Sequence, residues 1–157
     1  MSSLIELTRR GLVVCTAVSA LVVTGCGDDS TPPEPEPEVA TIRVTVGTTT
    51  IDVPYPTGAQ PAAIPLRVNV ANAVSFRFLG ADGQDEPIIV EERADLELTM
   101  DNLAAGWTFT ATGGSAATFT ANIRPTATGT FTPRLHLFNS EHGHDEVTKI
   151  LNVTVTQ

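Results

Sequence analysis

Residues 74–79 have the sequence VSFRFL, in which Val74, Phe76 and Phe78 alternate with Ser75 and Arg77. A period of two places successive side chains on opposite faces of a β-strand, so this stretch predicts a strand with one buried and one wet face. Strands of this kind are typical of antiparallel sheets. We therefore expect an antiparallel sheet whose two phenylalanines lie in the core.

The same alternation recurs from residue 40 to the end of the chain. Segments rich in Val, Ile, Thr and Phe are separated by Gly, Pro, Asn and Asp, and no segment keeps apolar residues at helical spacing over three turns. About seven to nine short strands in this length indicate an all-β sandwich, with a small β-barrel as the alternative. The other predicted apolar faces comprise Ile42, Val44 and Val46; Leu96, Leu98 and Met100; Trp107, Phe109 and Ala111; Phe119, Ala121 and Ile123; Phe131, Leu135 and Leu137; and Val147, Leu151, Val153 and Val155.

Residues 1–26 have the features of an exported lipoprotein. Two arginines precede an apolar run over residues 11–23, which is too short to span a bilayer comfortably, as in a secretory signal. Residues 23–26, Val-Thr-Gly-Cys, resemble the bacterial lipobox. The resemblance implies cleavage before Cys26 and attachment of a diacylglycerol to its thiol. The alternative is an ordinary signal peptide, or an N-terminal membrane helix, that contains a cysteine.

These features divide the chain into three parts. Residues 1–25 are the predicted lipoprotein signal peptide, and residues 26–39 are the lipidated cysteine with a Pro- and Glu-rich tether. Alternating proline and glutamate favours an extended polyproline II spacer. Residues 40–157 are long enough for one domain with its own core. The lipobox resemblance implies that a lipid anchor attaches this domain to a membrane of the bacterial cell envelope, at the outer membrane or the cell surface.

The order of features in residues 40–157 resembles the bacterial immunoglobulin-like domains of surface lipoproteins. A Gly-Thr-rich bend follows the first strand, a long middle strand ends in Ala-Asp-Gly at residues 81–83, and residues 102–106 lead into Trp107. The resemblance implies an immunoglobulin-like β-sandwich with the tryptophan in its core. Residues 40–157 contain no cysteine, so the disulfide that joins the two sheets of antibody domains is absent.

The charge of the chain excludes one class of function. The chain carries 9 basic and 18 acidic residues, and removal of residues 1–25 leaves 7 basic and 17 acidic residues, a net charge near −10. Such a domain repels nucleic-acid phosphates and anionic lipid surfaces, so nucleic-acid binding is excluded. The same negative field concentrates cations, including metal ions.

All three histidines of the chain lie in residues 135–147, LHLFNSEHGHDEV. We expect residues 130–138 and 146–156 to form two successive strands joined by a loop. His136 then lies on the outer face of the first strand near the loop, and the other two histidines lie in the loop itself. The three imidazoles are predicted to converge at this end of the sheet.

Clustered imidazole and carboxylate side chains indicate metal binding. Zinc and copper(II) prefer imidazole nitrogen and accept carboxylate oxygen, at roughly 2.0 to 2.2 Å for zinc. The spacing matches no distinctive zinc motif, so a solvated polar turn is the alternative interpretation. The predicted ligands are His136, His142, His144, Asp145 and Glu141, with Glu146, Glu91 and Glu92 as further candidates for the carboxylate.

Two hypotheses of function follow from the sequence. The first is a lipid-anchored extracytoplasmic module that binds a divalent transition metal, zinc or copper(II), through the histidine cluster. The alternative is a structural or adhesive surface lipoprotein that binds another envelope protein without metal.

Two other patterns have weaker interpretations. Ser140, His142 and Asp145 are the residue types of a hydrolase triad, but one short hairpin offers no oxyanion hole and no pocket, so we do not expect an enzyme. Residues 81–86, ADGQDE, have the early spacing of a calcium loop without its full ligand series. We interpret them as an acidic turn.

Overall fold

A computed structural model of the chain describes residues 35–157. The predicted signal peptide, residues 1–25, and the predicted lipidation site, Cys26, lie outside the described residues. Residues Glu34–Gln157 form one compact unit. Its described residues contain eleven strands and one short helix, and no helix among them is long and apolar enough to cross a membrane. The predicted all-β class is confirmed.

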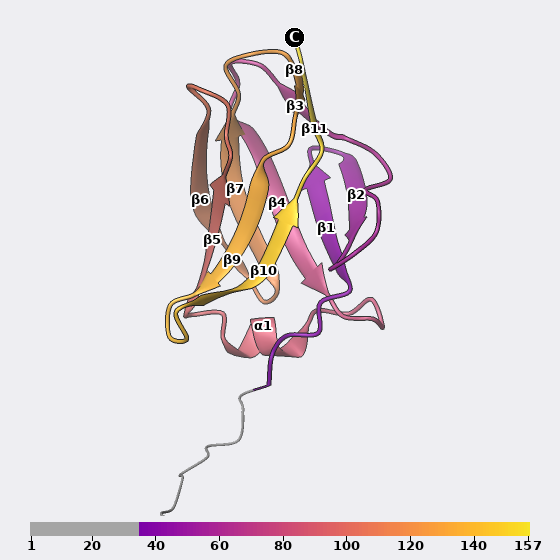
Figure 1. The fold of residues 1–157 in the computed structure, drawn as a ribbon, viewed down its shortest axis with the longest axis vertical. Coiled ribbons are helices and arrows are strands. Elements are labelled where there is room, and N and C mark those ends of the chain that lie inside the picture. The colour runs from indigo at the N-terminus through magenta and orange to yellow at the C-terminus, as the bar shows by residue number, and fades with distance from the viewer. Residues whose placement is uncertain (1–34) are drawn as a thin grey trace, which may run out of the picture. The chain divides into compact units, whose positions relative to one another are not determined.

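Five strands form the larger sheet, in the order β2-β1-β4-β7-β6 (Figure 1). Every neighbouring pair in this sheet is antiparallel. The stretch that predicted the fold is in its central strand, β4. The bounds are β1 (Thr41–Val46), β2 (Thr49–Pro54), β4 (Asn72–Leu79), β6 (Thr108–Ser115) and β7 (Thr118–Arg124).

Two three-stranded sheets complete the sandwich, and Figure 1 shows β9 and β10 in front of the larger sheet. Their orders are β10-β9-β5 and β3-β11-β8, so the strands do not close into the barrel that was the alternative prediction. The pair of β11 with β3 is parallel, unlike the antiparallel pairs predicted. The bounds are β3 (Ile64–Arg67), β5 (Leu96–Asp101), β8 (Gly129–Phe131), β9 (Arg134–Asn139), β10 (His144–Ile150) and β11 (Val153–Thr156), with helix α1 (Pro87–Glu91) between β4 and β5.

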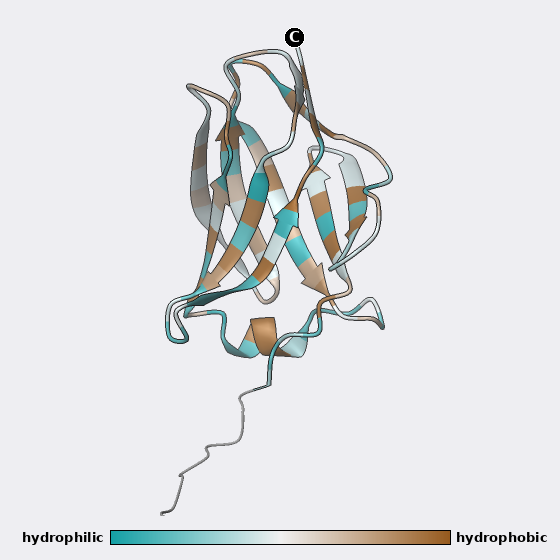
Figure 2. Ribbon diagram, viewed as in Figure 1, coloured by the Kyte–Doolittle hydropathy of each residue, from teal (hydrophilic) through white to brown (hydrophobic). Residues whose placement is uncertain are grey.

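The core lies between the sheets and follows the predicted alternation, except in β6, where Ala111 is exposed and Phe109 is half-buried. Apolar and polar bands alternate along the strands in Figure 2, and Val74, Phe76 and Phe78 of β4 are all buried. The ring of Phe78 packs edge-on against Phe119 of β7, with 5.6 Å between centroids. Trp107 is buried as predicted and belongs to the same core.

The core begins one residue before the predicted boundary at residue 40. Val39, which we assigned to the tether, is 6% exposed and belongs to the core cluster. The next residue continues the pairing of β1 with both of its neighbours, because Ala40 donates its N–H to the Leu79 carbonyl and accepts one from Tyr55. Val39 is thus held at the edge of the core.

The strand predicted at residues 130–138 is divided into β8 and β9, which belong to different sheets. Pro133 lies at the break and has no N–H to donate to a neighbouring strand. Its carbonyl accepts a hydrogen bond from the Leu151 N–H at 2.9 Å. The chain therefore changes partner strands at the proline.

The strand predicted at residues 146–156 is divided in the same way, into β10 and β11. At the break, the Gln60 side chain forms the backbone hydrogen bonds that a neighbouring strand would otherwise form. Its Oε1 accepts the Asn152 N–H at 2.9 Å, and its Nε2 donates to the Asn152 carbonyl at 2.8 Å. These divisions explain why the structure has more strands than the seven to nine predicted.

The ion pair between Arg43 of β1 and Asp52 of β2 predicts a pH-dependent contribution to stability. Two hydrogen bonds, of 2.7 and 2.9 Å, join the guanidinium to the carboxylate and lower the pKa of Asp52 below its usual value. Because the pKa of Asp52 is lower in the folded state, its charge stabilises the fold at pH values above the unfolded-state pKa of about 3.9. This contribution disappears as the pH falls through the folded-state pKa. We expect Asp52→Asn to lower the free energy of unfolding at pH 7 by less than about 1 kcal/mol, because the pair is exposed. Urea unfolding from pH 7 to pH 2 should show this difference vanish in acid, and a difference that persists there would contradict the assignment.

Candidate metal centre

The loop between β9 and β10 is organised by one buried amide. Asn139, the last residue of β9, is fully buried. Its Oδ1 accepts the backbone N–H groups of Glu141 and His142 at 3.0 and 3.2 Å, and its carbonyl accepts that of Gly143 at 2.9 Å. Gly143 has a φ of +74°, a conformation that glycine adopts without strain. The loop is therefore a tight turn around the asparagine.

The other end of the same amide lies between Glu92 and His142. Because Oδ1 of Asn139 accepts two N–H groups, the remaining atom is the NH₂ group, which can only donate. It lies 2.9 Å from Glu92 Oε2 and 3.1 Å from His142 Nδ1. In the tautomer with its proton on Nε2, His142 Nδ1 accepts this hydrogen bond and carries a lone pair.

A β-bulge directs Glu146 toward the two loop histidines. The register of β10 with β9 shifts between Asp145 and Val147, which leaves Glu146 as the extra residue. Bulges bend a strand and change the direction of a side chain. The Glu146 side chain is 3% exposed, and its Oε1 is buried without a hydrogen-bond partner in the described part of the chain.

Three side chains of this hairpin form a cluster able to hold a metal ion. Glu146 Oε1 lies 3.4 Å from His142 Nδ1 and 3.7 Å from His144 Nδ1. One ligand atom from each residue lies within 4.8 Å of the other two. The imidazole rings lie 5.6 Å apart between centroids, with 31° between their planes. Two histidines and one carboxylate therefore face a common point.

Two separations in the cluster are close to those between ligand atoms of one tetrahedral ion. Ligand atoms that bind one ion at roughly 2.0 to 2.2 Å lie about 3.3 to 3.6 Å from each other. The contacts of Glu146 Oε1 with the two histidines are close to this separation. The His144 side chain is 51% exposed, so solvent reaches this side of the cluster.

His136, which we predicted as a ligand, lies in a separate group with Asp145. Its Nδ1 is 2.7 Å from Asp145 Oδ2, and its Nε2 is 3.4 Å from Asp101 Oδ2. The register places His136 of β9 opposite Thr148 of β10 and Thr99 of β5, on the outer face and away from the turn. The structure thus brings together two of the three imidazoles, and the carboxylate beside them is Glu146 instead of Asp145.

The other candidates lie around the cluster. Glu141, also a predicted ligand, is exposed in the turn, and Glu91 is exposed at the end of α1. Glu92 lies close to the cluster, because the Asn139 amide bridges its carboxylate and His142. The Ser140 hydroxyl donates to the Asp95 carbonyl at 2.9 Å.

Sequence reasoning missed the role of Asn139 and the bulge that selects Glu146. Asparagine before a turn is a recognised sequence feature, because its side chain bonds to the backbone two residues later. This feature was present at Asn139 and would have fixed the turn at the end of β9. A bulge has no comparable indication in this sequence.

Comparison of the chain with protein-family models, with curated proteins and with solved structures found no match. Function is therefore argued from the residues and their geometry.

The structure predicts that Asn139→Ala destabilises the domain more than the loss of a single exposed hydrogen bond. The substitution removes a buried amide and leaves the Glu141 and His142 N–H groups without acceptors, at a cost of about 1 to 3 kcal/mol for each unsatisfied buried group. Urea unfolding measures the change. Ser140→Ala is the control, because the exposed hydroxyl donates one hydrogen bond, to the Asp95 carbonyl, and its loss should cost less than about 1.5 kcal/mol. Equal effects of the two substitutions would show that Asn139 does not organise the loop.

Proposed function

We propose that this protein is a lipid-anchored extracytoplasmic module that binds a divalent transition metal, zinc or copper(II), through His142, His144 and Glu146. The observation that carries the proposal is the contact between Glu146 Oε1 and His142 Nδ1. The carboxylate oxygen is buried without a hydrogen-bond donor, and the nitrogen 3.4 Å away offers a lone pair in the tautomer that accepts from Asn139. In that tautomer a cation bound by both atoms would balance the buried carboxylate charge.

The donor set favours borderline ions. Imidazole nitrogen with carboxylate oxygen suits zinc and copper(II), whereas copper(I) prefers thiolate and thioether ligands. Residues 35–157 contain no cysteine. When the metal binds at His142 Nδ1, it replaces the hydrogen bond from Asn139, whose NH₂ group keeps its contact with Glu92.

The exposure of the cluster supports capture of an exchangeable ion over a permanent structural role. Structural zinc sites usually have four protein ligands, whereas this cluster offers three. Imidazole binds metal only in its neutral form, so protons compete with the ion as the pH falls.

The proposed anchor rests on the sequence alone. Val-Thr-Gly-Cys at residues 23–26 and the Pro- and Glu-rich segment after it support a lipidated Cys26 and a spacer. An anchored module of this kind would hold its metal site at the envelope surface, at the outer membrane or outside the cell.

Titration of zinc and copper(II) into the compact unit Glu34–Gln157 tests the metal site. We expect His142→Ala and Glu146→Gln each to weaken metal binding by roughly 100-fold or more. Even the loss of a residue that only hydrogen-bonds to a metal ligand lowers the affinity about 10- to 100-fold. Glu141→Gln removes the same charge from the exposed loop. It should change the affinity by less than about threefold, which is smaller than the loss expected for a residue that supports a ligand. His136→Ala should also retain binding, which separates this ligand set from the one predicted by sequence. The proposal fails if the parent domain takes up no metal at neutral pH, or if Glu146→Gln binds as well as the parent.

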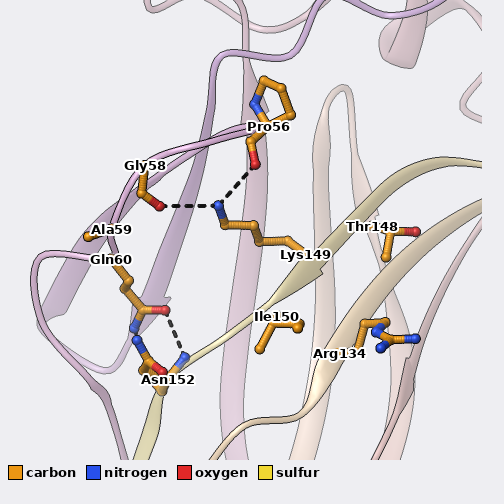
Figure 3. A pocket seen from close by; sticks show the side chains of 9 residues that line it. All are labelled: Pro56, Gly58, Ala59, Gln60, Arg134, Thr148, Lys149, Ile150 and Asn152. Atoms are coloured by element: carbon orange, nitrogen blue, oxygen red, sulfur yellow. Dashed lines mark hydrogen bonds between the residues drawn. The ribbon is translucent and has the colours of Figure 1, made fainter.

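A second function, binding to another envelope protein, is favoured by a groove beside β10. A cavity of about 580 Å³ lies between this edge strand and the loop after β2. Figure 3 shows Lys149 pointing across it toward the loop, where its Nζ lies 3.3 and 3.5 Å from the carbonyls of Pro56 and Gly58. Arg134 and the exposed Ile150 also line the groove. Two cations and an apolar side chain at a strand edge suit an acidic polypeptide partner.

Capture of envelope proteins on the immobilised unit Glu34–Gln157 distinguishes this second function from metal binding. If the groove binds a partner, Lys149→Glu should abolish capture, because it reverses the charge that faces the acidic partner. A chelator should leave capture unchanged. Capture that depends on added metal, or that survives Lys149→Glu, would exclude the groove as the binding surface.

A further inference from the structure

A second group of carboxylates surrounds a cavity near α1. The cavity, of about 510 Å³, lies between the segment before β1, the turn after β4 and the start of the helix. Figure 1 shows this segment passing beside α1. Four carboxylates line the cavity and no lysine or arginine does: Glu36, Glu38, Asp82 and Glu86.

Glu86 is the buried member of this group, with 5% exposure. It precedes α1 directly, and its side chain makes no capping hydrogen bond to the helix. Among the described residues, no hydrogen bond or ion pair reaches its carboxylate. Burial of an ionised carboxylate without a partner is costly unless a cation is close to it.

The absence of a side chain at Gly80 leaves space between two of the carboxylates. A methyl group added there would lie 3.1 Å from Glu86 Oε2 and 3.5 Å from Asp82 Oδ1. Both oxygens therefore face one small volume. The Asp82 carboxylate is fixed in position, because its Oδ1 also accepts the Gln84 N–H at 2.9 Å.

The neighbouring acidic residue has a partner, in contrast with Glu86. Asp85 Oδ1 lies 2.6 Å from Arg77 Nε on β4. The charge of Asp85 is thus balanced by an arginine, whereas the four carboxylates of the cavity have no basic residue in its lining.

We propose that this cavity is a binding site for a hard divalent cation, calcium. All of its charged groups are carboxylates, and calcium takes six to eight oxygen ligands at about 2.3 to 2.6 Å in flexible geometry. Asp82 and Glu86 come from the acidic turn, and Glu36 and Glu38 come from the segment before β1. A shared ion fastens that segment to the turn and fixes the direction in which the chain enters the domain. The site is independent of the histidine cluster and of the function proposed for it.

Calcium titration of the compact unit Glu34–Gln157, by calorimetry and by thermal unfolding, tests the site. We expect a Kd of roughly 10⁻⁴ to 10⁻³ M, as in extracellular calcium modules. At 10 mM calcium this affinity should raise the Tm by roughly 5 to 11 °C. Glu86→Gln should abolish the shift, because it removes the buried charge and keeps the shape. Glu97→Gln, which removes an exposed charge on β5, should keep it.

Further variants separate the possible causes. Asp82→Asn, at an exposed position, should also lose the shift, which keeps the test valid if Glu86→Gln does not fold. A chain of residues 39–157 should bind more weakly because it lacks Glu36 and Glu38, and His142→Ala should respond to calcium like the parent. The proposal is overturned if calcium leaves the Tm of the parent unchanged, if Glu86→Gln responds equally, or if magnesium binds with the same affinity.

Discussion

The buried amide of Asn139 is the interaction on which the β9–β10 turn and the histidine cluster in it depend. Its oxygen holds the turn through two backbone N–H groups, and its NH₂ group bridges Glu92 after α1 and His142 in the turn. A buried amide whose donors and acceptor are all satisfied is rigid, because any movement leaves one of them unpaired. The same amide holds the His142 ring beside Glu146, in the cluster that could bind a metal ion.

The general fold could be predicted because the core imposes a period of two on each strand. Phe76 and Phe78 were expected inside and are fully buried. The division of the last two long strands could not be predicted, because apolar alternation continues across both breaks. Pro133 was a visible indication of the first break. The second depends on Gln60, which is distant in sequence and bonds to Asn152 in place of a strand.

The candidate site could be predicted in part, for reasons of register. His142 and His144 are close in sequence, so a short loop brings them together whatever the exact pairing. The position of His136 depends on where β9 ends, and that point is set by Asn139. The choice between Asp145 and Glu146 depends on a bulge of one residue, and an error of one residue moves a side chain to the other face of a strand. The composition of the loop indicates the kind of site, but the path of the backbone determines which residues form it.

The positions of the basic residues explain why two buried carboxylates at one end of the domain have no lysine or arginine partner. Arg43 and Arg77 pair with acidic residues of the larger sheet and its adjoining turn, and Arg93 lies over the ring of Phe119, where burial lowers its pKa. No lysine or arginine among residues 35–157 forms an ion pair with Glu86 or Glu146. Both carboxylates are largely buried, near α1 and the β9–β10 turn at the same end of Figure 1. The net negative charge is spread over the domain, but the free-energy cost of an unbalanced charge is local, and it is greatest where a carboxylate is both buried and unpaired. A metal ion from solution is the kind of cation that could balance these charges, since no lysine or arginine is paired with them.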